Sequence, residues 1–86
     1  MKKVFDRKTI DINEYLQTVG NYNEVVLMWN GSKSYNGKSL ISIINALSGN
    51  EETKIEIIAN TETTTRFIND LKKINIKFEM ENTYND

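Results

Sequence analysis

The spacing of apolar residues switches several times between a helical period and a strand period along this 86-residue chain. Three segments have apolar residues at every third or fourth position, the pattern of a helix with one buried face. Between them, apolar residues are contiguous or alternate with polar ones, the pattern of strands. The predicted order is strand, helix, strand, strand, helix, strand, helix. This order is typical of a two-layer α+β domain with an antiparallel sheet of about four strands and three helices on one face.

Each of the three predicted helices begins at a residue that can cap it. Asp11 precedes the first helix, Ser39 opens the second, and Thr61 is predicted to cap the third. Gly20 and Gly49 follow the first two helices, where a left-handed C-terminal residue is expected. The expected apolar faces are Ile12, Tyr15, Leu16 and Val19, then Leu40, Ile43, Ile44 and Leu47, and then Phe67, Ile68, Leu71 and Ile74.

The predicted strands lie at residues 2–6, 24–30, about 32–36 and 53–59. The strand at 24–30 is apolar on both faces and is therefore expected in the centre of the sheet. Asn30-Gly31 follows it, and this dipeptide is the strongest short signal for a hairpin, because both residues tolerate positive φ.

The C-terminal segment has strand periodicity, because Ile76, Phe78 and Met80 alternate with charged residues. It predicts an additional strand, followed by a frayed polar tail at residues 82–86. A single domain is expected at residues 1–81, since a chain of this length supports only one.

Charge and composition exclude several classes of function. Lys and Arg total 11 and Asp and Glu total 12, so there is no basic excess for nucleic acid. The chain has no Cys and no His, which removes thiolate chemistry, the commonest general base and the commonest metal ligand. The carboxylates form no evident catalytic pair. We therefore expect no enzyme activity, no metal, no cofactor and no small-molecule substrate.

The N-terminal residues and the hydropathy pattern predict a cytoplasmic protein. No apolar run approaches the ~20 residues of a membrane span. Met1 is followed by charged residues rather than by the apolar region of a signal peptide. A membrane is accordingly not among the expected partners.

Gly37-Lys38-Ser39 opens a helix, which invites comparison with a phosphate-binding loop. That motif needs a glycine five positions before Gly37, where this chain has Ser32. The preceding strand also belongs to a hairpin rather than to a parallel crossover unit. A turn leading into a capped helix accounts for these residues without a nucleotide.

Two stretches resemble HPr, the histidine-containing phosphocarrier of the bacterial sugar phosphotransferase system. Residues 26–31, VLMWNG, resemble its second strand and Asn-Gly hairpin, and residues 36–44, NGKSLISII, resemble its regulatory serine with the helix that follows. The likeness covers roughly residues 15–74, and the strand at 53–57 arrives at the expected spacing. The resemblance implies an open-faced β-sandwich of one antiparallel sheet and three helices, in agreement with the apolar spacing.

The resemblance fails at the phosphocarrier site. The histidine position of the family falls near Lys8, within the segment RKTID, and neither the histidine nor the Arg-Pro pair after it is present. Lysine cannot replace the imidazole nitrogen that carries phosphate. We therefore do not expect phosphate transfer from phosphoenolpyruvate. The chain is similar in this respect to catabolite-repression HPr-like proteins.

The resemblance implies regulatory phosphorylation at Ser39, with partner binding by Lys38, Leu40, Ile41 and Ile44. The implied partners are a serine kinase and a transcriptional regulator. A phosphate at the start of a helix would face unpaired N–H groups and the positive end of the helix dipole. Three alternatives stay open: Ser39 as a cap only, with the apolar residues in the core; a phosphocarrier with unrecognised chemistry; and an interaction domain unrelated to sugar transport.

Overall fold

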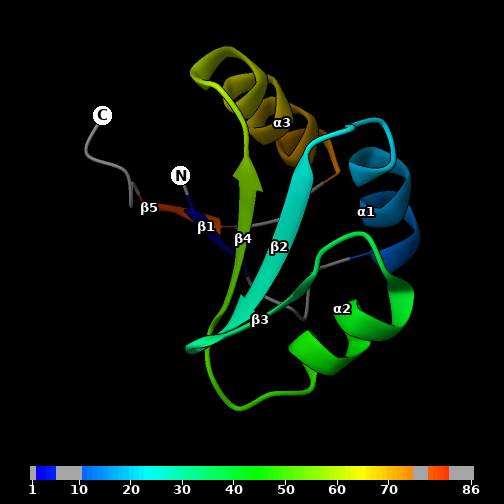
Figure 1. Cartoon of the computed structure of the whole chain (residues 1–86), viewed down its shortest axis with the longest axis vertical. Helices are drawn as coiled ribbons and strands as arrows, with labels where there is room; N and C mark the ends of the chain where they lie inside the picture. The colour runs from blue at the N-terminus through cyan, green and yellow to red at the C-terminus, as the bar shows by residue number, and fades with distance from the viewer. Residues whose placement is uncertain (1, 6–10, 75–77, 82–86) are drawn as a thin grey trace.

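The computed structural model describes residues 2–5, 11–74 and 78–81 (Figure 1). Its elements follow the predicted order, with one strand added at the C-terminal end. They are β1 (Lys2–Phe5), α1 (Ile12–Val19), β2 (Val25–Asn30), β3 (Lys33–Asn36), α2 (Leu40–Leu47), β4 (Thr53–Ile58), α3 (Thr61–Lys73) and β5 (Phe78–Glu81).

The sheet is antiparallel throughout. Strand β2 pairs with β3 and β4, and β1 and β5 extend the sheet beyond β4, which gives the order β3-β2-β4-β1-β5. The central place predicted for the second strand is confirmed, because β2 pairs with both β3 and β4. In the segment for which an additional C-terminal strand was predicted, β5 spans residues 78–81. Ile76 and the tail at 82–86 lie outside the described residues.

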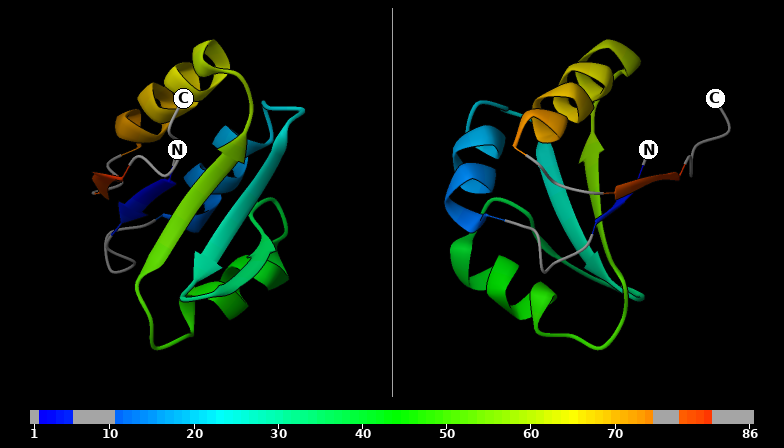
Figure 2. Two further views of the ribbon diagram at one scale, coloured as in Figure 1. Left: turned by 60° about the vertical axis from the view of Figure 1, so that its left-hand side comes forward. Right: turned by 180° about the vertical axis from the view of Figure 1, so that it is seen from behind.

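The three helices cover one face of the sheet, as the two views of Figure 2 show. Side chains alternate along β2 and β4, so that one face of each strand is buried against the helices. No described helix lies on the opposite face. The buried apolar core consists of Tyr15, Val19, Tyr22, Val26, Met28, Ile43, Ala46, Ile55, Ile57, Phe67, Ile68 and Leu71. The domain is therefore of the α+β class, with a helix-covered face and a helix-free face.

The hairpin between β2 and β3 turns at Gly31, as the Asn-Gly signal predicts. Gly31 has φ of 60°, which only glycine adopts at little cost. Asn30 itself belongs to β2 and pairs with Lys33. Its side-chain amide donates to the carbonyls of Ala46 and Glu51, each at 3.0 Å. Asn30 therefore ties the C-terminal end of α2 to the sheet.

Two of the three predicted caps are confirmed and one is wrong. Asp11 accepts from the backbone N–H groups of Asn13 and Glu14, and Ser39 caps α2. The third helix is capped by Asn60 instead of Thr61. Asn60 has extended backbone, and its Oδ1 accepts from the N–H of Thr63 at 2.8 Å. An amide oxygen one residue earlier thus satisfies the first turn, and Thr61 becomes the first helical residue.

The two glycines that follow α1 and α2 are not left-handed. Gly20 has φ of −64° and continues the right-handed turn, with its N–H bonded to the Leu16 carbonyl at 3.0 Å. Helix α2 ends at Ser48, and a Cβ on Gly49 would stand 2.2 Å from Oδ1 of Asn30. Gly49 is therefore needed for close approach to the Asn30 side chain rather than for its backbone angle.

No helix in the described ranges is both long enough and apolar enough to span a membrane.

Candidate functional site

A tight turn between β3 and α2 fixes where the second helix begins. The Gly37 N–H donates to the Val26 carbonyl at 2.8 Å, and a Cβ on Gly37 would stand 2.7 Å from Cγ1 of Val26. Asn36 closes the turn in two ways: its Oδ1 accepts from the Lys38 N–H at 2.9 Å, and its carbonyl accepts from the Ser39 N–H at 3.3 Å. Only glycine fits at this contact, so the turn is held directly against β2.

Ser39 is the N-cap of α2, with extended backbone at φ −103° and ψ 125°. Its Oγ accepts from the Ser42 N–H at 3.5 Å, a long contact, and its carbonyl accepts from the Ile43 N–H at 2.8 Å. The side chain is half-buried. No acidic residue lies in the first turn of α2. The hydroxyl is therefore at an uncompensated positive helix end.

Beside Ser39, helix α2 exposes three large apolar side chains. Leu40 is 49% exposed, Ile41 74% and Ile44 47%; we call these three residues the α2 surface. The predicted apolar face of this helix is thus only partly in the core. Ile43 of the predicted face is fully buried, and so is Ala46, because the side of the helix that carries these two residues faces the sheet.

The Lys38 ammonium group contacts the loop between α1 and β2. Its Nζ donates to the backbone carbonyl of Tyr22. The sequence predicted Lys38 as a cation beside Ser39 and as part of the partner-binding surface. In the structure the ammonium group binds the Tyr22 carbonyl, so Lys38 joins this loop to the start of α2.

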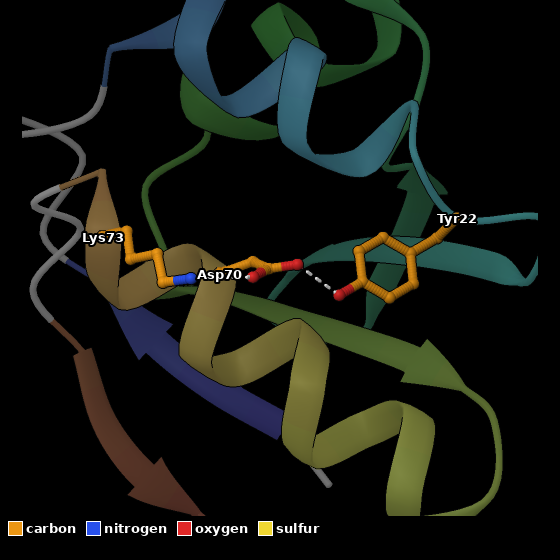
Figure 3. A network of polar contacts seen from close by, with 3 residues as sticks. All are labelled: Tyr22, Asp70 and Lys73. Atoms are coloured by element: carbon orange, nitrogen blue, oxygen red, sulfur yellow. Dashed lines mark hydrogen bonds and ion pairs between the residues drawn. The ribbon is translucent and has the colours of Figure 1, made fainter.

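Tyr22 is in turn fixed by α3 through the contacts in Figure 3. Its hydroxyl donates to Oδ2 of Asp70 at 2.5 Å, and Nζ of Lys73 lies 3.7 Å from Oδ1 of Asp70. The ring contacts the edge of Phe67, and the Arg66 guanidinium lies 5.0 Å from the ring centre. Burial and the Asp70 hydrogen bond raise the pKa of Tyr22. The loop whose carbonyl Lys38 contacts is therefore anchored to α3.

Sequence reasoning missed a groove of about 420 Å³ at the open end of the β2–β3 hairpin. Val25, Leu27, Ser34 and Asn36 are among the residues that line it. By the strand register, Leu27 and Asn36 are direct neighbours. One sequence signal could have indicated it. Residues 25–29 are apolar on both faces of the strand, and the helices cover only one of these faces.

The position of the lost histidine, Lys8, lies outside the described residues. Among the residues that are described, no group of three or more Asp, Glu, His or Cys side chains could hold a metal ion. Of the predicted site residues, Ser39 lies beside the α2 surface, and Lys38 binds the Tyr22 carbonyl.

A scan against protein-family models found no match, and a search of curated proteins found no relative. The function proposed below therefore rests on the geometry around α2.

Proposed function

We propose that this protein is an HPr-like module without phosphotransfer chemistry, which binds a partner protein through Ser39 and the α2 surface. The observation that carries the proposal is the exposure of Leu40, Ile41 and Ile44 beside the N-cap serine. The HPr-like fold is part of the proposal. It is supported by the element order and by the antiparallel order β3-β2-β4-β1, with β5 as an addition.

The α2 surface is suited to a protein partner. Neighbouring large apolar side chains on a small domain mark interaction sites more often than isolated ones do. A helix with exposed apolar residues one and four positions apart can enter an apolar groove of a partner. The helix is also rigid at both ends, since Asn30 binds the carbonyl of Ala46 and Gly37 packs on β2. Binding would therefore cost little ordering of the backbone.

Phosphorylation of Ser39 would change the character of this surface. A phosphate adds about −1.5 to −2 charges and would face the free N–H groups of the first turn. It would place that charge next to Leu40 and Ile41, at the edge of the apolar residues. Modification is therefore expected to alter partner choice at an otherwise intact helix.

The test of the modification uses a serine kinase that phosphorylates HPr proteins, with ATP. We expect the mass of one phosphate to be added to the wild-type chain and none to Ser39→Ala. Ser48→Ala is the matched control, because Ser48 is exposed at the other end of the same helix. Phosphate retained by Ser39→Ala would contradict the assignment.

The test of the binding surface is photo-crosslinking in the cell. A photoreactive residue at Ile41 should capture a discrete partner, and one at the exposed Thr65 on α3 should not. Ser39→Asp should change the yield or identity of the product formed at position 41. The same product from both positions would argue against a dedicated α2 surface.

Incubation with enzyme I and labelled phosphoenolpyruvate separates this proposal from the phosphocarrier alternative. A chain without histidine should remain unlabelled. Acid-labile phosphate on the chain would replace our proposal with a phosphocarrier of unrecognised chemistry.

A further inference from the structure

Strand β3 is an outer strand of the sheet, and half of its backbone groups face away from β2. The Gly37 N–H donates to the Val26 carbonyl, so residues 37 and 26 form a hydrogen-bonded pair, and every second residue pair of the β2–β3 ladder is hydrogen-bonded in the same way. It follows that Lys33 and Tyr35 bond to β2, whereas Ser34 and Asn36 direct their backbone groups outward. The Asn36 carbonyl is used by Ser39. In the described part of the chain, the N–H and carbonyl of Ser34 and the N–H of Asn36 have no partner.

The groove lies beside this edge, and residues of both faces of the sheet line it, with Val25 and Leu27 on the helix-free side. It forms at the end of the hairpin where β3 has already ended at Asn36, whereas β2 extends further, as far as its first residue, Val25. Its apolar lining includes Val25, which is 56% exposed, and Leu27. Ile58, the cross-strand neighbour of Val25, is 54% exposed and extends the apolar surface onto β4. An open edge and an adjoining apolar groove are the two parts of a strand-addition site.

We infer that the β3 edge binds an extended segment of a second protein, which adds to the sheet antiparallel to β3. The residue opposite Asn36 would place an apolar side chain on the face of the sheet that carries Val25 and Leu27. Three residues later, the segment would lie opposite Lys33, on the helix-covered face. Lys33 is exposed and is a cation, so an acidic residue complements it there. The segment would therefore have an apolar residue followed three positions later by Asp or Glu.

A partner segment fits this edge better than a second copy of the chain. Self-pairing would join strands of four residues, Lys33–Asn36, and would bury far less than the roughly 1,200 Å² of a stable interface. A lysine on an edge strand also opposes such pairing. The site is distinct from the α2 surface, and the inference does not depend on the proposed function.

The probe is a library of short random peptides displayed on phage and selected on the full chain. We expect enrichment of peptides with an apolar residue and an acidic residue three positions apart. In nuclear magnetic resonance spectra, a selected peptide should shift the amides of Ser34 and Asn36 and the methyl groups of Val25 and Leu27. No enrichment, or shifts confined to α2, would overturn the inference.

Ser34→Pro is the decisive variant. It removes an outward N–H and leaves the β2–β3 ladder bonds in place, and proline is tolerated on an edge strand in that orientation. We expect affinity for the selected peptide to fall at least about tenfold, which corresponds to about 1.4 kcal/mol. Ile41→Glu on the α2 surface is the matched control and should leave this affinity unchanged, so the two sites are tested separately.

Two further measurements keep the inference testable if Ser34→Pro does not fold. A peptide N-methylated at the nitrogen that pairs with the Ser34 carbonyl should lose the same affinity on the wild-type chain. Sedimentation equilibrium of the wild-type chain should show a monomer; a dimer that the selected peptide dissociates would mean that a second copy occupies the edge. Equal binding of the methylated and unmethylated peptides would also overturn strand addition.

Discussion

Helices α2 and α3 divide their apolar residues in opposite ways. Most residues of α3 are polar, and its three large apolar side chains, Phe67, Ile68 and Leu71, are all buried. Helix α2, with the sequence LISIINAL, is mostly apolar, yet it leaves the whole α2 surface at least 47% exposed. Apolar periodicity thus predicts that a helix forms, but it does not predict how much of the helix the domain can cover.

The two helices also differ in what holds them to the rest of the domain. Helix α3 is held by its core face and by the bond between Asp70 and Tyr22. Helix α2 has a small core face of Ile43 and Ala46, and its ends are fixed by Gly37 and by the Asn30 amide. Helix α3 therefore contributes mainly to stability, whereas much of the apolar surface of α2 is not used by the core.

The largest expected effect separates the buried face of α3 from the exposed face of α2. Leu71 has no exposed surface, so Leu71→Ala should lower the free energy of unfolding by about 2–5 kcal/mol. Ile41 is 74% exposed, and Ile41→Ala should change the free energy of unfolding by less than about 0.5 kcal/mol. Urea titration measures both. A comparable loss for the two variants would mean that the α2 surface is part of the folding core.

The next effect concerns the attachment of α3 at Tyr22. Tyr22→Phe removes the hydrogen bond to the partly exposed Asp70 and should cost about 1 kcal/mol near neutral pH. Burial and this bond raise the pKa of Tyr22 in the folded state, so the folded chain retains the proton more strongly than the unfolded chain. The resulting stability is present below a pH of about 10 and is lost as the pH rises through the folded-state pKa.

Urea titrations between neutral and strongly alkaline pH measure this dependence. The free energy of unfolding of the wild type should fall more steeply above a pH of about 10 than that of Tyr22→Phe. Identical slopes would show that Tyr22 does not hold its proton through the fold.

Much of the fold could be predicted from local sequence signals, because each signal acts within a few residues. Apolar spacing predicted the element order, and the cap at Ser39 and the turn at Gly31 follow from single side chains. The cap at Asn60 instead of Thr61 was a local error of one residue, whereas two other errors arose where distant residues decide. Gly49 is fixed by the approach of Asn30, and the partition between Ile43 and Ile44 is fixed by the orientation of α2 on the sheet.

The candidate site was less predictable than the fold for the same reason. Ser39 and the residues after it could be named from the chain, since they are consecutive. The engagement of Lys38 by the Tyr22 carbonyl could not, because it depends on a loop that α3 fixes from the other side. The groove beside β3 arises from the departure of the chain at Gly37, which no local pattern encodes.

A smaller effect distinguishes the caps of the two helices. The Asn60 amide oxygen lies 2.8 Å from the Thr63 N–H, whereas Oγ of Ser39 lies 3.5 Å from the Ser42 N–H. Asn60→Ala should therefore cost about 1 kcal/mol, and Ser39→Ala about 0.5 kcal/mol. Ser39→Asp should recover that loss, since a carboxylate both caps the helix and complements its dipole. Thermal unfolding followed by circular dichroism ranks the three variants; a larger loss for Ser39→Ala than for Asn60→Ala would reverse the comparison.

The last expected effect has the opposite sign and concerns Tyr15, whose hydroxyl oxygen would lie 3.1 Å from a Cβ on Gly37, just before α2. Its hydroxyl is fully buried and has no hydrogen-bond partner among the described residues, and burial raises its pKa. A buried hydroxyl without a partner costs free energy, so Tyr15→Phe should leave the free energy of unfolding unchanged or raise it by up to about 1 kcal/mol. Tyr22→Phe is the matched control, because it removes the same atom where that atom is bonded. A loss at Tyr15 as large as the loss at Tyr22 would show that the Tyr15 hydroxyl is bonded in solution.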